Sequence, residues 1–133
     1  MEYGEFGPER LKEVMDIYRE AGWMAYLQDD AKLRRAFEHS LCILGAFEGD
    51  VLVAFVRCVG DGEHVLLIQD LIVREAYRRR GVGAELMRRI LDRYSGVRMR
   101  ALLTDAQDER ANRFYRAIGF TEVRESGITA YMK

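Results

Sequence analysis

Residues 1–40 have the hydrophobic spacing of two amphipathic helices. Apolar side chains recur there at intervals of three and four residues, which places them on one face of a helix. The first stripe ends before Gly22 and consists of Leu11, Val14, Met15 and Tyr18. The second stripe follows two aspartates, Asp29 and Asp30, that can cap a helix, and it consists of Leu33, Ala36 and Phe37.

Three apolar runs with the character of β-strands fill the middle of the chain, at 41–47, 51–59 and 65–73. A short break that contains Gly49 separates the first two and predicts a hairpin. The third run is almost continuously apolar, which is typical of a central strand covered on both faces. Gln69 and Asp70 interrupt it, and because side chains alternate along a strand, we expect these two to point to opposite faces.

After residue 80 the helical period returns. The apolar stripe of the next predicted helix consists of Leu86, Met87, Ile90, Leu91 and Tyr94. A strand at 97–103, a helix at 108–117 and two short strands at 120–123 and 128–132 complete the pattern. The order is α-α-β-β-β-α-β-α-β-β, which predicts an α/β or α+β fold with helices on the faces of a sheet.

Composition narrows the function classes. The length of 133 residues predicts a single domain over 1–133. The 21 basic and 22 acidic side chains nearly balance, so we expect no nucleic-acid-binding surface. No apolar run approaches the about 18 residues that span a membrane. The first residues include acids and no apolar stretch, unlike a signal peptide. Two cysteines and two histidines disfavour a metal site, and we expect reduced thiols and a cytoplasmic protein.

The segment that carries the chemistry joins the third strand to the following helix. It reads Arg78-Arg79-Arg80-Gly81-Val82-Gly83. Glycines at the start of a helix let a ligand approach the backbone, and the first N–H groups of the helix attract anions. The segment lacks the Lys-Ser/Thr of a nucleotide P-loop, and Leu86 stands where a dinucleotide fingerprint has its third glycine. The sequence therefore predicts a phosphate site of another kind.

Two motifs resemble those of the GNAT N-acetyltransferase superfamily. Residues 78–83 are similar to its acyl-CoA pyrophosphate loop, Gln/Arg-x-x-Gly-x-Gly/Ala, which follows an apolar strand. Residues 111–120, Ala-Asn-Arg-Phe-Tyr-Arg-Ala-Ile-Gly-Phe, resemble the second signature, Asn-x-x-Ala-x-x-Phe-Tyr-x-x-x-Gly-Phe. Asp108 stands where the family often has Asn, which weakens the transfer of a CoA contact to that position. Residues 1–40 match the family only in being helical.

The resemblance implies a mixed, mainly antiparallel central sheet of about six to seven strands with helices on both faces. It also implies acetyl-CoA as co-substrate and no metal. The end of the strand pairs with the pantetheine arm, and the glycine loop binds the pyrophosphate through backbone amides. The cofactor-binding residues implied are Leu71, Ile72, Val73, Arg78, Arg79, Arg80, Gly81, Val82, Gly83, Ala84 and Asn112. Tyr115 corresponds to the tyrosine that protonates the departing sulfur.

Several of these residues have a plainer interpretation. On spacing alone Tyr115 is a core tyrosine, and Asn112 is an exposed helix residue. The two polar residues of the third strand either form structural hydrogen bonds to a loop or an arginine, or one of them lies at the acceptor site. In the second case Asp70 is a water-mediated base and Gln69 a substrate ligand. Trp23 and Tyr26 either anchor helix packing or form a wall of the acceptor site.

The leading hypothesis is transfer of an acetyl group to a primary amine, with direct attack of the amine on the thioester. The acceptor is a small molecule or a peptide, and nothing in the sequence chooses between them. Small family members are often homodimers, and this analogy is the one indication of the oligomeric state, which the sequence itself leaves open. The alternative is a non-catalytic CoA-binding regulatory module on the same fold. A nucleic-acid-binding domain that uses the arginines is disfavoured by the net charge of −1.

Overall fold

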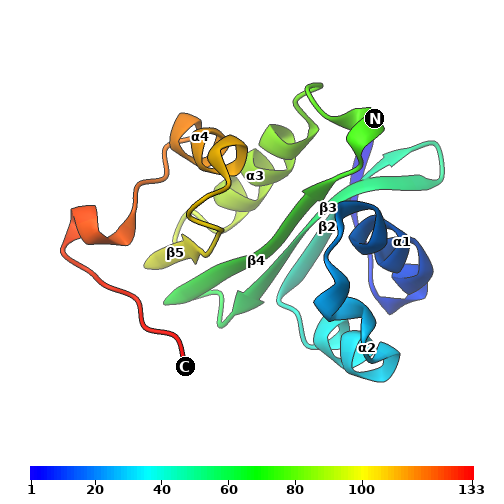
Figure 1. Cartoon of the computed structure of the whole chain (residues 1–133), viewed down its shortest axis with the longest axis horizontal. Helices are drawn as coiled ribbons and strands as arrows, with labels where there is room; N and C mark the ends of the chain where they lie inside the picture. Colours follow the sequence, from blue (N-terminus) through cyan, green and yellow to red (C-terminus); the bar gives the residue numbers. More distant parts are fainter. The chain divides into compact units, whose positions relative to one another are not determined.

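A five-stranded mixed sheet forms the centre of the first of two compact units, Met1–Leu102 and Leu103–Lys133, in a computed structural model that describes all 133 residues (Figure 1). The strands lie in sequence order and are β1 (Glu2–Glu5), β2 (Cys42–Glu48), β3 (Val51–Gly60), β4 (Val65–Val73) and β5 (Met99–Leu102). Neighbours from β1 to β4 pair antiparallel, whereas β4 and β5 pair parallel.

Helices cover both faces of this sheet, as the sequence predicts. In Figure 1, α1 (Leu11–Ala21) and α2 (Asp30–Glu38) lie on one face and α3 (Val82–Arg93) lies on the other. Short 3-10 helices occur at Pro8–Arg10, Met24–Leu27 and Glu75–Tyr77. Two of these helix ends lie at the residues that the sequence indicates. Gly22 ends α1 with a left-handed φ of 78°. The Asp29 side chain caps the start of α2 by accepting the N–H of Lys32. None of the helices is long and apolar enough to cross a bilayer.

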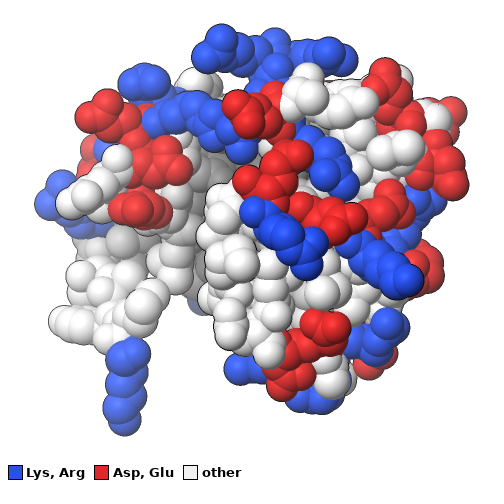
Figure 2. Space-filling view, turned by 45° about the vertical axis from the view of Figure 1, so that its right-hand side comes forward, with Lys and Arg blue, Asp and Glu red and all other residues white.

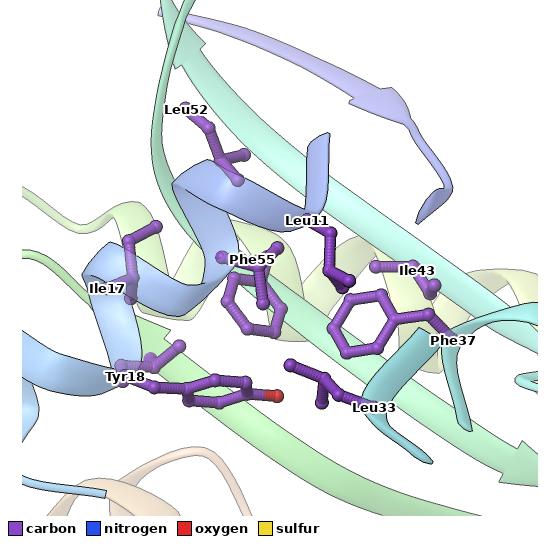
Figure 3. Close-up of a cluster of buried hydrophobic side chains, with 10 residues drawn as sticks. Leu11, Ile17, Tyr18, Leu33, Phe37, Ile43, Leu52 and Phe55 are labelled. Atoms are coloured by element: carbon purple, nitrogen blue, oxygen red, sulfur yellow. The ribbon is translucent and has the colours of Figure 1, made fainter. Parts of the chain in front are cut away.

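The core lies between the sheet and the first two helices. Figure 3 shows the Phe55 ring of β3 surrounded by side chains of α1 and α2, among them Leu11, Tyr18 and Phe37. Phe55 is fully buried and meets Tyr18, Phe37 and Phe6 edge to face, with centroid distances of 5.6, 6.1 and 6.0 Å. On the opposite side α3 buries Val82, Leu86, Met87 and Ile90. The helical stripes predicted from the sequence thus form this core.

The second unit contains α4 (Glu109–Ala117) and a 3-10 helix at Val123–Ser126. Asp108 caps α4, because its carboxylate accepts the Ala111 N–H at 3.0 Å. The strands predicted at 120–123 and 128–132 do not form, so the sheet has five strands rather than six or seven. An apolar run becomes a strand only when it finds an edge to pair with and a core to enter, and here Tyr131 and Met132 stay 94% and 85% exposed.

The sequence pattern also misses β1, which is an edge strand of the sheet. Apart from Tyr3, its residues Glu-Tyr-Gly-Glu are poor strand formers, and pairing with β2, in the register Glu2–Phe47 to Glu5–Leu44, makes them a strand. The single domain expected from the length stays a prediction.

Candidate functional site

A β-bulge separates the two polar residues of β4. Arg57 of β3 lies opposite Asp70, whereas the next residue of β3, Cys58, lies opposite Ile68. Gln69 therefore has no partner on β3 and is the extra residue of the bulge. The result is one exposed amide, Gln69, beside one carboxylate, Asp70, that is only 2% exposed. The expectation that these two side chains point to opposite faces is wrong: both hydrogen-bond the Tyr26 hydroxyl, because the extra residue of a bulge interrupts the alternation along the strand.

The parallel pairing with β5 ends at the same point of β4. Val65–Ile68 lie opposite Met99–Leu102, and beyond Ile68 the only strand beside β4 is β3. The backbone of Leu71, Ile72 and Val73 is thus free of a strand partner on the β5 side. An extended ligand can hydrogen-bond to such an edge as an additional strand does.

The loop after β4 leads into the N-terminus of α3. Gly81 is the N-cap of α3 and has a left-handed φ of 76°, a conformation that favours glycine. No side chain caps the helix there. The first N–H groups, from Val82 to Ala84, have no intrahelical carbonyl to bind, and the helix dipole adds positive potential at the same place. Together these features suit an anionic group such as a phosphate.

The three consecutive arginines before Gly81 have different environments. Arg78 is partly buried, and its Nε donates to the carbonyl of Val73 at 3.2 Å, so its side chain ties the loop to the end of β4. Arg79 and Arg80 are exposed, and the Arg80 guanidinium lies 5.1 Å from the centre of the Tyr77 ring. Arg79 has a φ of 64°, which is uncommon outside glycine. Basic and acidic side chains are interspersed on the face that Figure 2 shows.

Asp70 is the centre of a buried polar cluster. Its Oδ2 accepts the Tyr18 hydroxyl at 2.8 Å and the Arg57 Nε at 2.7 Å, and its Oδ1 accepts the Tyr26 hydroxyl at 2.7 Å. The charge is paired with that of Arg57, whose residue is 4% exposed. An arginine is one of the partners that the structural interpretation of Asp70 expects, whereas the two tyrosines are not predicted. Its part in removing a substrate proton stays a prediction.

One arm of this cluster reaches the surface. Tyr26 is half-buried, and its hydroxyl also accepts a hydrogen bond from Gln69 Nε2 at 3.1 Å. Trp23 is 37% exposed and stacks on Tyr18 at 6.0 Å, while Tyr18 stacks on Tyr26 at 4.4 Å. Of the predicted acceptor residues, Tyr26 contacts Asp70 directly, Gln69 contacts Tyr26, and Trp23 contacts Tyr18. Burial, with Asp70 as a second cause, raises the pKa of the Tyr26 phenol.

The site residues of the second unit lie on α4. Tyr115 is half-buried between Phe114 and Phe120, with ring centroids at 5.3 and 6.1 Å, and burial followed by Asp108 raises the pKa of its phenol. Asn112 donates to the carbonyls of Asp105 and Asp108 at 2.9 and 2.7 Å, so its amide holds the turn before the helix. The roles predicted for Tyr115 and Asn112 stay predictions.

Two residues of the site are missed by sequence reasoning. Tyr18 looks like one more member of a helical apolar stripe, although its hydroxyl binds Asp70. Arg57 is the one charged residue in the apolar run at 51–59, and a lone charge in a buried strand signals a buried partner. Pairing Arg57 with the equally isolated Asp70 of the next strand would have found the cluster.

The cysteines are core residues, as predicted. Cys42 and Cys58 lie opposite each other on β2 and β3, both are buried, and burial raises the pKa of the Cys58 thiol to about 12. No group of three or more His, Cys, Asp or Glu side chains is arranged to hold a metal ion.

Comparisons with known proteins match this architecture. The sequence profile of the Acetyltransferase (GNAT) family matches residues 9–120. Among solved structures, a GNAT family acetyltransferase, SP0256 from Streptococcus pneumoniae TIGR4, is 31% identical with a TM-score of 0.86, over 99% of this chain and 96% of that one. No curated protein matches the chain in sequence.

Two more distant structures share the fold. The PaiA N-acetyltransferase from Thermoplasma acidophilum, in complex with coenzyme A, is 18% identical, with a TM-score of 0.76 over 90% of this chain and 89% of that one. The aminoglycoside N-acetyltransferase AAC(6')-Iy, also in complex with CoA, is 18% identical, with a TM-score of 0.72 over 99% and 98%. The family profile covers most of the chain, and the chain therefore belongs to the GNAT family of acetyltransferases and is an acyltransferase.

Proposed function

We propose that the chain transfers the acetyl group of acetyl-CoA to the nitrogen of a primary amine. The observation that carries the proposal is the continuity of two binding features: the unpaired edge of Leu71–Val73 leads, through one short loop, to the uncapped N-terminus of α3 at Gly81. An extended arm that ends in a pyrophosphate needs both features in this order. The fold relatives crystallised with CoA support the same assignment.

In this proposal the residues of the first unit hold the thioester. Backbone groups of Leu71, Ile72 and Val73 pair with the pantetheine arm, and the N–H groups of Gly81, Val82, Gly83 and Ala84 face the pyrophosphate. The exposed Arg79 and Arg80 add positive charge beside it, and Arg78 fixes the loop through the Val73 carbonyl. Asn112 is kept as a CoA contact only through the family resemblance, because its amide already donates to two carbonyls.

The chemistry needs a proton for sulfur and a route for the proton of the amine. The nitrogen forms a bond to the acetyl carbon as the carbon–sulfur bond breaks, and Tyr115 gives its phenolic proton to the departing thiolate. A raised pKa keeps this phenol protonated at neutral pH, which an acid requires. The proton of the amine leaves through water, with the Asp70 cluster orienting the nucleophile. AAC(6')-Iy, named as an aminoglycoside N-acetyltransferase, supports an amine acceptor.

Thermal shift with acetyl-CoA tests the cofactor site. A ligand that binds only the native state raises the melting temperature by mass action. Gly83→Val puts a branched side chain over the first turn of α3 and should abolish the shift. Gly96→Val is the matched control, because a Cβ at that exposed glycine meets nothing within 4 Å. An unchanged shift in folded Gly83→Val would rule out this loop.

Free-thiol release from acetyl-CoA tests the reaction. Tyr115→Phe keeps the ring packing and removes the proton, so turnover should fall by about 10²-fold while acetyl-CoA binding persists. Tyr131→Phe, which deletes a hydroxyl at a side chain that is 94% exposed, serves as the control. Binding of acetyl-CoA without any amine-dependent thiol release would instead identify a non-catalytic CoA-binding module.

A further inference from the structure

The hydrogen bond between the Tyr26 hydroxyl and Asp70 has one possible direction. The hydroxyl lies 2.7 Å from Asp70 Oδ1, and a carboxylate paired with Arg57 has no proton to give, so Tyr26 is the donor. Oδ2 of the same carboxylate accepts from Tyr18 and Arg57, so both oxygens of Asp70 act as acceptors. Burial and the carboxylate both raise the pKa of the Tyr26 phenol, which excludes it as a base at neutral pH.

With its proton committed, Tyr26 Oη is purely an acceptor toward its other neighbours. This settles the orientation of the Gln69 amide: the group 3.1 Å from Oη must be the NH₂, because the amide oxygen would find no donor there. Gln69 is exposed and stands on the bulge of β4, so a ligand can displace its amide without disturbing the core. The same lone pair then accepts a hydrogen bond from that ligand.

The place of this acceptor suits the proposed reaction. Gln69 lies two residues before Leu71, the start of the unpaired edge, and a strand advances about 3.3 Å per residue. A group held by Tyr26 Oη is therefore within one side-chain length of that edge. An amine that donates one N–H to Oη keeps its lone pair free to attack, which a contact to the lone pair would prevent.

We propose that Tyr26 Oη recognises the acceptor by taking an N–H from its primary amine in the place that the Gln69 amide occupies in the free enzyme. This rests on the proposed function and deepens it by naming the group that holds the reacting nitrogen through one of its N–H donors. Asp70 and Arg57 form a neutral ion pair, so the selection depends on hydrogen-bond direction rather than on net charge. Tyr26 is a specificity-determining residue, and Asp70 is a positioning residue that acts through it.

The first experiment compares two phenols of the same carboxylate. Tyr26→Phe and Tyr18→Phe each remove one hydroxyl hydrogen bond to Asp70, but Tyr18 is fully buried whereas Tyr26 reaches the surface. The wild-type protein is first assayed by thiol release with benzylamine, spermidine and neamine. With the amine that reacts fastest, Tyr26→Phe should raise the amine KM about tenfold or more, with acetyl-CoA KM unchanged. Tyr18→Phe should lower the melting temperature without that rise.

The second experiment needs no variant. The N,N-dimethyl and N,N,N-trimethyl derivatives of the accepted amine are measured as competitive inhibitors of the wild-type enzyme. The dimethylammonium ion keeps one N–H and the trimethylammonium ion has none, so we expect inhibition to weaken about tenfold on the last methylation. If the aromatic faces of Trp23 or Tyr26 alone recognised the ligand, the trimethylammonium ion would inhibit as strongly as the dimethylammonium ion or more strongly.

The outcomes distinguish failure of Tyr26 as the acceptor of the amine N–H from failure of the proposed acetyl transfer. Equal amine KM values in Tyr26→Phe and Tyr18→Phe, or equal inhibition by the two methylated amines, would overturn this inference and leave the acetyl transfer intact. If Tyr26→Phe does not fold, the inhibitor series alone decides. Absence of thiol release with all three amines would overturn the proposed function and this inference with it.

Discussion

The two compact units differ in how their polar groups are satisfied. In the first unit even the charges that enter the core are paired, as Arg57 and Asp70 show at 2.7 Å with both side chains almost fully buried. In the second unit no residue of α4 is buried, and the last residues form no strand. Buried contacts stabilise the first unit, whereas in the second unit local caps and turns act together with the half-buried rings around Tyr115.

Local hydrogen bonds account for much of the order in the second unit. Asp108 caps α4, Asn112 bridges two carbonyls before it, and Glu122 and Glu125 form a reciprocal capping box around the last 3-10 helix. Such contacts stabilise by about 0.5–2 kcal/mol each, far less than a buried aromatic cluster. A capping motif can therefore form a turn in a segment whose hydrophobic pattern alone predicts a strand, as the capping box beside residues 120–123 does.

Hydrogen exchange should reveal the largest contrast between the units. Amides in the middle of β3, such as those of Phe55 and Val56, should exchange only by global unfolding, about 10³-fold or more slowly than those of residues 129–133. The measurement is amide exchange followed by NMR at neutral pH. Comparable protection in residues 129–133 would mean that the chain end is paired in solution and that the two units do not differ in this way.

Breaking the buried pair should destabilise the first unit strongly. Arg57→Met removes the guanidinium and leaves Asp70 charged and buried, which should cost about 3–5 kcal/mol in the free energy of unfolding. Urea titration followed by circular dichroism measures this. Arg124→Met is the matched control in the second unit, because that side chain is 81% exposed and its ion pair to Glu122 should contribute about 1 kcal/mol at most.

A second substitution distinguishes a charge effect from lost packing. Arg57 also lies over the Phe37 and Tyr26 rings at 5.2 and 5.8 Å, so Met replaces some of its contacts with apolar ones. Adding Asp70→Asn to Arg57→Met removes the uncompensated charge and should recover part of the loss. A double variant as unstable as the sum of the single variants would show that the pair contributes through packing.

Most elements of the first unit could be predicted from the sequence because each has a core face. The stripes of α1, α2 and α3 and the runs of β2, β3 and β4 bury most of the side chains that identify them. The pattern fails where burial does not select the structure. β1 is a strand only through its pairing with β2, and the apolar residues near Tyr131 have no core to enter.

The candidate site shows the same division. The loop before α3 follows from glycines and arginines that are adjacent in sequence, so the motif alone locates it. The Asp70 cluster joins residues 13 to 52 positions apart, and only the register of β3 against β4 brings Arg57 opposite Asp70. The bulge at Gln69 depends on the same register, which no local pattern encodes.

The smallest expected effect concerns a turn whose charge is held by the backbone. In the β3–β4 connection Asp61 Oδ1 accepts the N–H groups of Glu63, His64 and Val65 at 2.8–3.0 Å, and these bonds lower the pKa of Asp61 to about 2. A lowered pKa in the folded state stabilises the fold above the ordinary value near 3.8, and this contribution is lost as the pH falls through about 2.

Asp61→Asn keeps the oxygen that accepts these bonds but removes the charge. Its melting temperature should lie below that of the wild type between pH 5 and pH 7, and the gap should close as the pH falls from about 4 to about 2. Asp105→Asn is the control in the second unit, where the carboxylate accepts a single N–H, from Gln107 at 2.8 Å, and a smaller gap is expected. A gap for Asp61→Asn that persists at pH 2 would show that shape, not charge, is what the turn requires, because only the charged form of Asp61 is lost on acidification.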